Sequence, residues 1–218
     1  MKRAVLMRKQ AMRRNLFLDY DGTLIDSEKR QYGLFIELTG NANLSFQDYW
    51  EDKRNGLNQE AMLSKHCKYS PDEKKQFKKC WHDSIENPER LVQDFLFEGV
   101  YDFLDEQSRN CNLYLVTARH HGQNLHEQME QLRIKNFFNK ILNTAQKTSK
   151  ALKVKECLIP NASDIFVGDT GEDILAGRDL GIQSIGVTSG MCSRKMLESY
   201  HPDHIYKSIT ELSAHKIV

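Results

Sequence analysis

The stretch DYDGTL at residues 19–24 follows the apolar run LFL at residues 16–18, which is typical of a short buried strand. Because side chains two apart in a strand point the same way, Asp19 and Asp21 can both face one small space where this strand ends. Ligands of open α/β sheets bind at that carboxyl end. Gly22 permits a sharp turn whose backbone N–H groups are free to bind an anion. Two close carboxylates repel each other unless a cation or a proton lies between them, so the stretch predicts a divalent cation, a nucleophile and an acid or base.

Strand and helix patterns alternate along the rest of the chain, apart from one long polar segment. Strands are expected at residues 15–20, 112–117, 140–143, 165–168, 184–188 and 204–206, and helices at 99–106, 124–132, 150–158, 172–180, 195–199 and 209–215. Repeated β-α units require a parallel sheet that is covered by helices on both faces. The predicted fold class is therefore α/β, with a Rossmann-like parallel-sheet core.

The polar segment, residues 26–94, carries apolar side chains at helical spacing, which predicts four to five helices and no strand. Ser70 before Pro71, followed by two acids, is typical of a helix start. We therefore expect an inserted all-helical domain at residues 26–94, and a core that consists of residues 1–25 and 95–218.

Composition narrows the possible classes of protein. The 218 residues include 31 basic and 30 acidic side chains, a formal net charge of +1, so no nucleic-acid partner is expected. Five cysteines without a C-x-x-C pair argue against a disulfide scaffold or a structural zinc site and favour a reduced cytoplasm. No apolar run is long enough to cross a membrane. The basic N-terminus is interpreted as a frayed leader or as sequence before a start at Met12, and the protein as a monomer or weak dimer.

Further chemistry is expected where other strands end. Thr117 closes one strand, followed by Ala118, and its hydroxyl can donate to a phosphate oxygen; the alternative is a cap of the next helix. Asp169 is placed like Asp19, and Asp173 follows one helical turn later. Such hard oxygen ligands suit Mg²⁺ better than zinc, although an acid in the first turn of a helix is the alternative for Asp173.

Lysine and histidine candidates are less specific. Lys150 opens a helix, where a cation is unfavourable for the helix dipole, and this hints at an anionic partner. Lys147 is a competitor, and either lysine could be an exposed side chain. His120, His121 and His126 lack acid or cysteine ligands at fitting spacing, so surface or capping roles are expected for them.

In sum, these residues resemble the haloacid dehalogenase superfamily of phosphotransferases. Residues 19–24 match its first motif, D-x-D-G-T-L, and Thr117 matches the second, a Thr or Ser at a strand end. Lys150 matches the third, a lysine that opens a helix, and GDTGED at residues 168–173 matches the fourth, G-D-x-x-x-D. The helical insert resembles the cap of the phosphoglycolate phosphatase and β-phosphoglucomutase branch. In that branch a proline often follows the lysine, whereas Ala151 follows it here, which keeps Lys147 open as the phosphate-binding lysine.

The resemblance implies a Mg²⁺-dependent phosphatase that hydrolyses a small phosphate monoester, a small phosphorylated metabolite being the expected partner. Asp19 would attack phosphorus and become an aspartyl phosphate. Asp21 would act as acid and then as base, and the neighbouring carboxylate would help it to hold a proton near neutral pH. The expected Mg²⁺ ligands are Asp19, the backbone carbonyl of Asp21, and Asp169, with Asp173 orienting metal-bound water or Lys150.

By the same resemblance, Thr117 and Lys150, with backbone N–H groups near Gly22 and Ala118, would bind the phosphoryl oxygens, and the insert would close over the site. The main alternative is a phosphomutase that transfers the phosphoryl group to a sugar phosphate. A dehalogenase of this superfamily needs one carboxylate and no metal, which the pair Asp21 and Asp169 disfavours. A non-enzymatic binding domain has no need to keep mutually repelling carboxylates.

Overall fold

The computed structural model describes residues 13–215 and Ile217, so the possible start at Met12 and most of the basic leader lie outside the described residues. Six parallel strands form one sheet in the order β5-β4-β1-β6-β7-β8. These strands are β1 (Asn15–Leu18), β4 (Asn112–Thr117), β5 (Lys140–Asn143), β6 (Ile165–Gly168), β7 (Gln183–Val187) and β8 (His204–Tyr206). The predicted α/β class with a Rossmann-like parallel sheet is confirmed.

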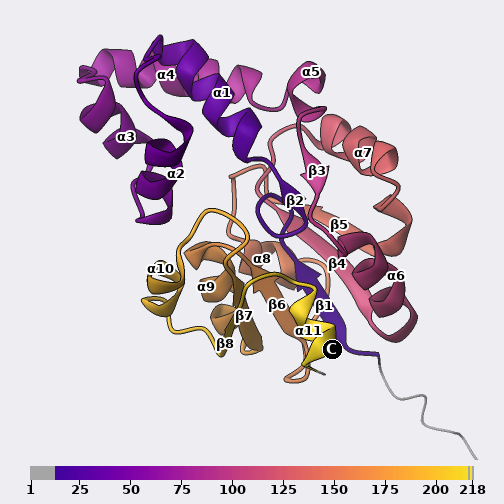
Figure 1. Ribbon diagram of the computed structural model, residues 1–218. Coiled ribbons are helices and arrows are strands. Elements are labelled where there is room, and N and C mark those ends of the chain that lie inside the picture. The colour runs from indigo at the N-terminus through magenta and orange to yellow at the C-terminus, as the bar shows by residue number, and fades with distance from the viewer. Residues whose placement is uncertain (1–12, 216, 218) are drawn as a thin grey trace, which may run out of the picture.

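Helices cover both faces of the sheet because alternate side chains of each strand point to opposite sides. Leu16 and Leu18 of β1 belong to one apolar cluster, and Phe17 between them belongs to another. The first cluster contains residues of α6, α7 and α11, and the second contains residues of α8 and α9 (Figure 1). The helices and the short 3-10 turn of the core are α6 (Val100–Asn110), α7 (Gly122–Gln131), η1 (Lys135–Phe137), α8 (Lys150–Lys155), α9 (Gly171–Leu180), α10 (Arg194–Glu198) and α11 (Glu211–Ala214).

The chain leaves and re-enters the core through a short ribbon that the sequence pattern does not predict. The strands β2 (Ile25–Asp26) and β3 (Phe95–Leu96) pair antiparallel. Each has two residues, too few to show the alternation by which a strand is recognised. The first strand also ends at Leu18 and not at residue 20, because the Tyr20 carbonyl accepts the N–H groups of three later residues and closes a loop.

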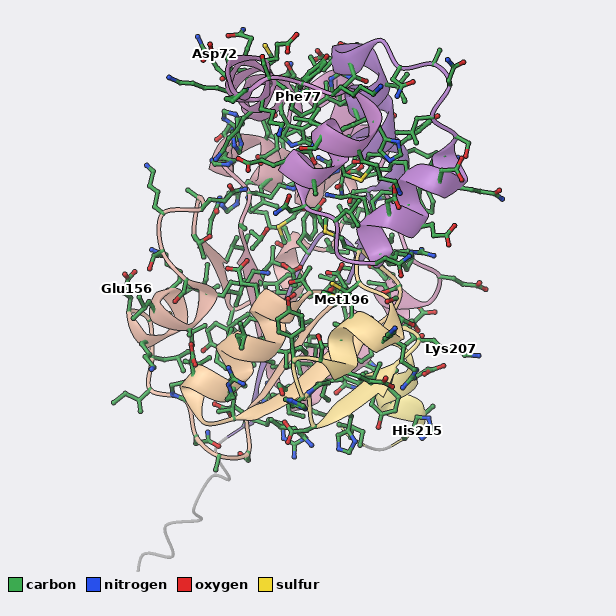
Figure 2. The ribbon with its side chains drawn as sticks, turned by 90° about the vertical axis from the view of Figure 1, so that its left-hand side faces the viewer. Asp72, Phe77, Glu156, Met196, Lys207 and His215 are labelled. Atoms are coloured by element: carbon green, nitrogen blue, oxygen red, sulfur yellow. The ribbon has the colours of Figure 1, made fainter. Side chains whose placement is uncertain are left out.

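Between β2 and β3 the insert is helical, as predicted. Its helices are α1 (Glu28–Thr39), α2 (Phe46–Arg54), α3 (Gln59–His66), α4 (Pro71–Ser84) and α5 (Pro88–Leu91). Phe35, Tyr49 and Phe77 lie in an apolar core of their own, which the insert forms apart from the sheet (Figures 1 and 2). Helix α4 begins where the sequence predicts a helix start, and the Ser70 side chain and Glu73 form a capping box there.

The insert touches the core along the turn between α2 and α3. The Ser193 N–H of the core donates to the Arg54 carbonyl at 3.1 Å. A Cβ atom added to Gly56 would lie 2.9 Å from Cε of Met196, so this turn packs closely on α10. Figure 2 shows Met196 at the boundary between the two parts, below the helices that carry Phe77. No helix among the described residues is long and apolar enough to cross a membrane.

Lys53 of α2 is a buried cation at this boundary, 7% exposed. Within residues 13–215 it forms no ion pair with a carboxylate, and its ammonium donates to Gln59 Oε1 at 3.5 Å. Burial lowers the pKa of Lys53 from 10.5 to about 8 and outweighs the opposing interaction with Cys192. The folded state therefore holds the proton of Lys53 less tightly than the unfolded chain does, so this residue costs stability below pH 8.

We expect Lys53→Met to raise the free energy of unfolding at pH 7 by about 2 kcal/mol, because it removes an unpaired buried charge. The gain shrinks as the pH rises from 8 towards 10.5, where the wild-type lysine is neutral in both states. Urea unfolding at both ends of that range measures it. Lys79→Met on the exposed face of α4 is the control, and a Lys53→Met protein that is less stable than wild type at pH 7 would contradict the account.

Candidate active site

A cavity of about 240 Å³ lies where the carboxyl ends of β1, β4 and β6 face the helical insert. The core contributes Asp19, Thr117 and Asp169 to its lining, and the insert contributes Arg30 and Trp81 among others. Figure 1 shows the insert on the side of the sheet where β1 leads into β2. The strand ends from which the sequence predicts chemistry therefore meet in one space, and that space is shared between the core and the insert.

Lys150 lies at the centre of the cluster, with Nζ 2.6 Å from Asp19 Oδ1 and 2.6 Å from Asp173 Oδ1. All three side chains are buried. Helix α8 begins at Lys150, with Ser149 as its N-cap. Lys147 is exposed three residues earlier, so Lys150 is the one of the two candidates that reaches the carboxylates.

Asp169 follows β6 as Asp19 follows β1, and it is held from several sides. Its Oδ2 accepts the Met191 N–H at 2.6 Å, and its Oδ1 accepts the Thr23 hydroxyl at 3.3 Å. Burial, followed by the charge of Asp173, raises the pKa of Asp169 to about 7, although the Met191 N–H and Lys150 oppose the shift. Burial likewise raises the pKa of Asp19 well above its usual range, against the attraction of Lys150.

The donor set fits Mg²⁺. Asp19, Asp169 and Asp173 each offer a carboxylate oxygen, and these atoms lie within 4.8 Å of one another. Lys150 pairs with two of the three carboxylates, Asp19 and Asp173. Burial is the largest cause that raises the pKa values of Asp19 and Asp169, so a bound cation would favour their ionised forms. Hard carboxylate oxygens are the ligands that Mg²⁺ prefers. The Asp21 side chain is not part of this cluster, and the expected use of its backbone carbonyl as a ligand stays a prediction.

The Asp169 carboxylate lies against Gly22 and Gly190, where a side chain on either residue would take its place. A Cβ atom added to Gly190 would lie 2.1 Å from Asp169 Oδ2 and 2.6 Å from the Gly22 Cα. We expect Gly190→Ala to displace the Asp169 carboxylate and to lower kcat/KM about a hundredfold, the scale of loss for a misplaced catalytic group. Phosphatase assays with saturating Mg²⁺ measure the loss. Gly33→Ala, in α1 with open space around the added Cβ atom, is the control, and a Gly190→Ala enzyme with wild-type activity would contradict this role.

Thr117 and Ala118 line the same cavity, directly after β4. Thr117 is buried, and its Oγ1 accepts the Arg119 N–H at 3.3 Å. The N-cap of the next helix is His121, so the capping alternative for Thr117 does not apply. The hydroxyl keeps its proton for another acceptor.

Of the backbone N–H groups that are expected near Gly22 to bind an anion, its own is not available. This N–H donates to the Ile25 carbonyl at 2.8 Å and so closes the loop on itself, which leaves it unavailable to an anion. Gly22 has a φ of 80°, a left-handed conformation that favours glycine. A Cβ atom at this position would lie 2.3 Å from Asp169 Oδ2. The glycine is therefore required for the turn and for the close approach of Asp169.

The expectation that Asp21 holds a proton near neutral pH is also wrong for this arrangement. Arg119 donates to both oxygens of the Asp21 carboxylate, at 2.6 and 2.8 Å, and Arg30 donates to Oδ1 at 2.5 Å. Burial raises the pKa of Asp21, but the two guanidinium groups outweigh burial and hold it well below its usual range. The sequence argument counted the neighbouring carboxylate and missed both arginines.

Arg30 and Arg119 belong to a buried network that joins the insert to the core. Asp94, beside the re-entry strand, accepts from Arg30 at 2.9 Å and from Arg119 at 3.4 Å. Gln128 of α7 donates to Asp94 at 2.9 Å and accepts the Tyr20 hydroxyl at 3.2 Å. Arg119 lies two residues beyond a strand-ending Thr, and this position could have identified it from the sequence as a residue of the site. Arg30 carries no comparable signal, because its partners lie 9 and 64 residues away.

The fold and the site define an α/β protein with a parallel sheet, in which buried carboxylates and a lysine lie at strand ends beneath a helical insert. The profile of the haloacid dehalogenase-like hydrolase family matches residues 16–187. The chain belongs to this family, and it is a hydrolase of the phosphatase type.

Relatives and solved structures agree with this assignment. Pyrophosphatase PpaX of Oceanobacillus iheyensis is 25% identical over 91% of this chain and 94% of the relative. A haloacid dehalogenase-like hydrolase from Streptococcus pneumoniae, 25% identical, has a similar structure with a TM-score of 0.77 over 93% of this chain and 98% of its own. The HAD-hydrolase YfnB from Bacillus subtilis, described as bound to magnesium, is 16% identical with a TM-score of 0.62 over 94% of this chain and 99% of its own, and it supports the fold.

Proposed function

We propose that this protein is a Mg²⁺-dependent phosphatase that hydrolyses a small phosphate monoester through an aspartyl phosphate on Asp19. The observation that carries the proposal is the buried cluster in which Lys150 bridges Asp19 and Asp173 beside Asp169, open to a cavity shared with the insert. A carboxylate that is next to a cation site and faces a cavity can attack a phosphorus atom. The family assignment makes phosphoryl chemistry the natural use of such a cluster.

In the first step, an oxygen of Asp19 attacks phosphorus while the ester oxygen leaves with its electron pair. Bound Mg²⁺, held by Asp19, Asp169 and the Asp21 carbonyl, would neutralise charge on the phosphoryl oxygens. Lys150 and the Thr117 hydroxyl would hold the same oxygens, together with the Ala118 N–H. Since the Gly22 N–H is engaged within its own loop, it has no part in this step.

In the second step, water attacks the phosphorus of the aspartyl phosphate, the bond between phosphorus and the Asp19 oxygen breaks to return the carboxylate, and ionised Asp21 takes the water's proton. The contacts to Arg30 and Arg119 keep Asp21 ionised, but they also lower its pKa and so weaken it as a base. The same contacts oppose protonation of the leaving group by Asp21 in the first step. Acid catalysis by Asp21 would therefore require those contacts to loosen when substrate binds.

We assign residues 26–94 the role of a cap on the core formed by residues 1–25 and 95–218. The cap supplies one wall of the cavity and would exclude water during the first step. The network of Arg30 and Asp94 spans the point at which the two parts join.

A phosphomutase remains the alternative, because it would use the same Asp19 intermediate with a sugar phosphate as acceptor. Incubation with a hexose 1-phosphate separates the two functions: a phosphatase releases inorganic phosphate, and a mutase yields an isomeric sugar phosphate. Pyrophosphate is included in the substrate panel because the relative from Oceanobacillus iheyensis carries the name pyrophosphatase.

Removal of divalent cations with EDTA is expected to abolish phosphate release from a panel of phosphate monoesters. Mg²⁺ should restore the activity, and Ca²⁺ should restore little of it because its coordination is looser and longer. Phosphate release followed with each cation at matched free concentration measures the effect. Full activity in EDTA would refute the metal dependence, and no activity on any monoester with Mg²⁺ would refute the proposed function.

A further inference from the structure

Glu86 is a buried carboxylate in the segment that returns from the insert to the core. Within residues 13–215 no lysine, arginine or histidine side chain forms an ion pair with it. Its Oε1 accepts the backbone N–H of His120 and its Oε2 accepts that of His121, at 2.8 Å each. A buried carboxylate is costly unless it is paired or hydrogen-bonded, and hydrogen bonds to an ionised group are roughly twice as strong as neutral ones. The carboxylate therefore holds this stretch of backbone firmly.

The stretch of backbone that Glu86 holds lies directly before α7. His121 is the N-cap residue of α7, but its side chain forms no capping hydrogen bond. The N-terminus of a helix carries partial positive charge, which stabilises a carboxylate beside it. The anion at this helix start is thus Glu86, while the His120 ring lines the cavity and has neither the surface role nor the capping role that the sequence predicts.

The loop between β4 and α7 is short, and it is held at both ends. Thr117 ends β4 and is held by the sheet. Glu86 holds the backbone from His120 onward. Ala118 and Arg119 lie between these two points, so the positions of their backbones depend on both.

The segment that carries Glu86 is itself fastened to α7. Asn124 Nδ2 donates to the Glu86 carbonyl at 2.8 Å. Gln128 Nε2 donates to the Leu91 carbonyl at 3.0 Å and to Asp94 at 2.9 Å. Figure 1 shows α5 beside α7, in agreement with these contacts. The returning segment is therefore a fixed support from which the carboxylate reaches the loop.

We propose that Glu86 is a positioning residue of the active site, which holds the loop after β4 so that the Ala118 N–H meets the transferred phosphoryl group and Arg119 meets Asp21. The inference rests on the proposed function and deepens it, because it names a residue of the returning segment on which the phosphoryl site depends. Arg119 reaches Asp21 through two hydrogen bonds of 2.6 and 2.8 Å, which a loop shift of about 1 Å would break. Glu86 acts on the substrate only through the loop, since both of its oxygens are engaged there.

The test compares two substitutions of Glu86 that keep the length of the side chain. Glu86→Met removes both acceptors and should lower kcat/KM at least about tenfold, because a displacement of about 1 Å at a catalytic site costs up to about a hundredfold. Glu86→Gln keeps one acceptor oxygen and should lose less. Glu89→Gln, at an exposed position of α5, is the matched control for loss of a carboxylate from the same segment and should keep wild-type activity.

Two readouts separate positioning from stability, both taken at a temperature at which thermal unfolding curves show each variant to be folded. The inhibition constant of inorganic phosphate with Mg²⁺ should rise at least about threefold in Glu86→Met, because a hydrogen bond to the anion is weakened. The loss of kcat/KM should agree within about twofold among ω-hydroxyalkyl phosphates of two to five carbons, since the loop acts on the phosphoryl group and not on the leaving group. A purely structural role would leave the folded variant with wild-type values.

Amide hydrogen exchange followed by NMR tests the hold in the wild-type protein without any substitution. The His120 and His121 amides should exchange slowly, because both donate to a buried acceptor. Fast exchange of both amides would overturn the inference and leave the proposed function intact. The same holds for a folded Glu86→Met protein with wild-type kcat/KM and phosphate inhibition, or with a loss confined to some chain lengths. Absence of hydrolysis in the wild type, or hydrolysis that survives Asp19→Asn, would reject the proposed function and the inference together.

Discussion

Asp19→Asn is expected to lower kcat/KM at least about a thousandfold, because the amide cannot attack phosphorus as the carboxylate does. Any residual rate should depend on the leaving group, because direct attack by water breaks the ester bond in the same step. Steady-state assays with the best monoester of the panel measure the loss, and they require enzyme free of contaminating phosphatase.

The fold should survive this change. Asp19 is a buried carboxyl beside Asp169 and Asp173, and its charge is repelled by both. Asn is the same size and still offers an oxygen to Lys150, so the midpoint of thermal unfolding should fall little or rise. Substantial activity in a folded Asp19→Asn protein would reject Asp19 as the nucleophile.

Lys150→Met is expected to harm both activity and stability. It removes the cation that Asp19 and Asp173 share within the buried cluster, and breaking a buried ion pair from one side costs about 3 kcal/mol. Activity should fall at least about a hundredfold, since a donor to the transferred phosphoryl group is lost. Urea unfolding in EDTA together with phosphatase assays in Mg²⁺ measures the two effects.

The loss of stability in Lys150→Met should depend on pH in a defined direction. Without Lys150 the pKa of Asp19, already raised by burial, rises further, so the carboxyl is neutral at low pH and must be ionised at high pH. The destabilisation should therefore be smaller at about pH 5 than at about pH 8. Lys147→Met, at an exposed position of the same loop, is the control. Equal stability losses for the two variants would contradict the role of Lys150.

The parts of the fold that the sequence predicts are those with a strong local period. Each core strand appears in the sequence as a short apolar run, and the structure has all six within two residues of the expected ends. The ribbon of β2 and β3 is not predicted, because a strand of two residues is too short to show an alternation of apolar and polar side chains. The predicted helix at 150–158 ends as α8 at Lys155, before the break introduced by Pro160.

The same distinction applies to the site. Asp19, Thr117, Lys150 and Asp169 follow strands or open helices, so the parallel sheet alone brings them to one edge. Arg30 and its partners meet through the packing of the insert on the core, which no local pattern encodes. The sequence therefore predicts the wrong direction for the pKa of Asp21, because that pKa depends on two arginines from different parts of the chain.

The central claim is that Asp19 carries the phosphoryl group between the two steps. Asp21→Asn should slow the second step more than the first when p-nitrophenyl phosphate is the substrate, because its leaving group needs no proton. Acid quenching of this variant during turnover, followed by peptide mass spectrometry, should show one added phosphoryl group on the peptide that contains Asp19. The same peptide should remain unmodified in the Asp19→Asn Asp21→Asn double variant. Turnover without any phosphorylated peptide, or phosphorylation at another residue, would contradict the mechanism.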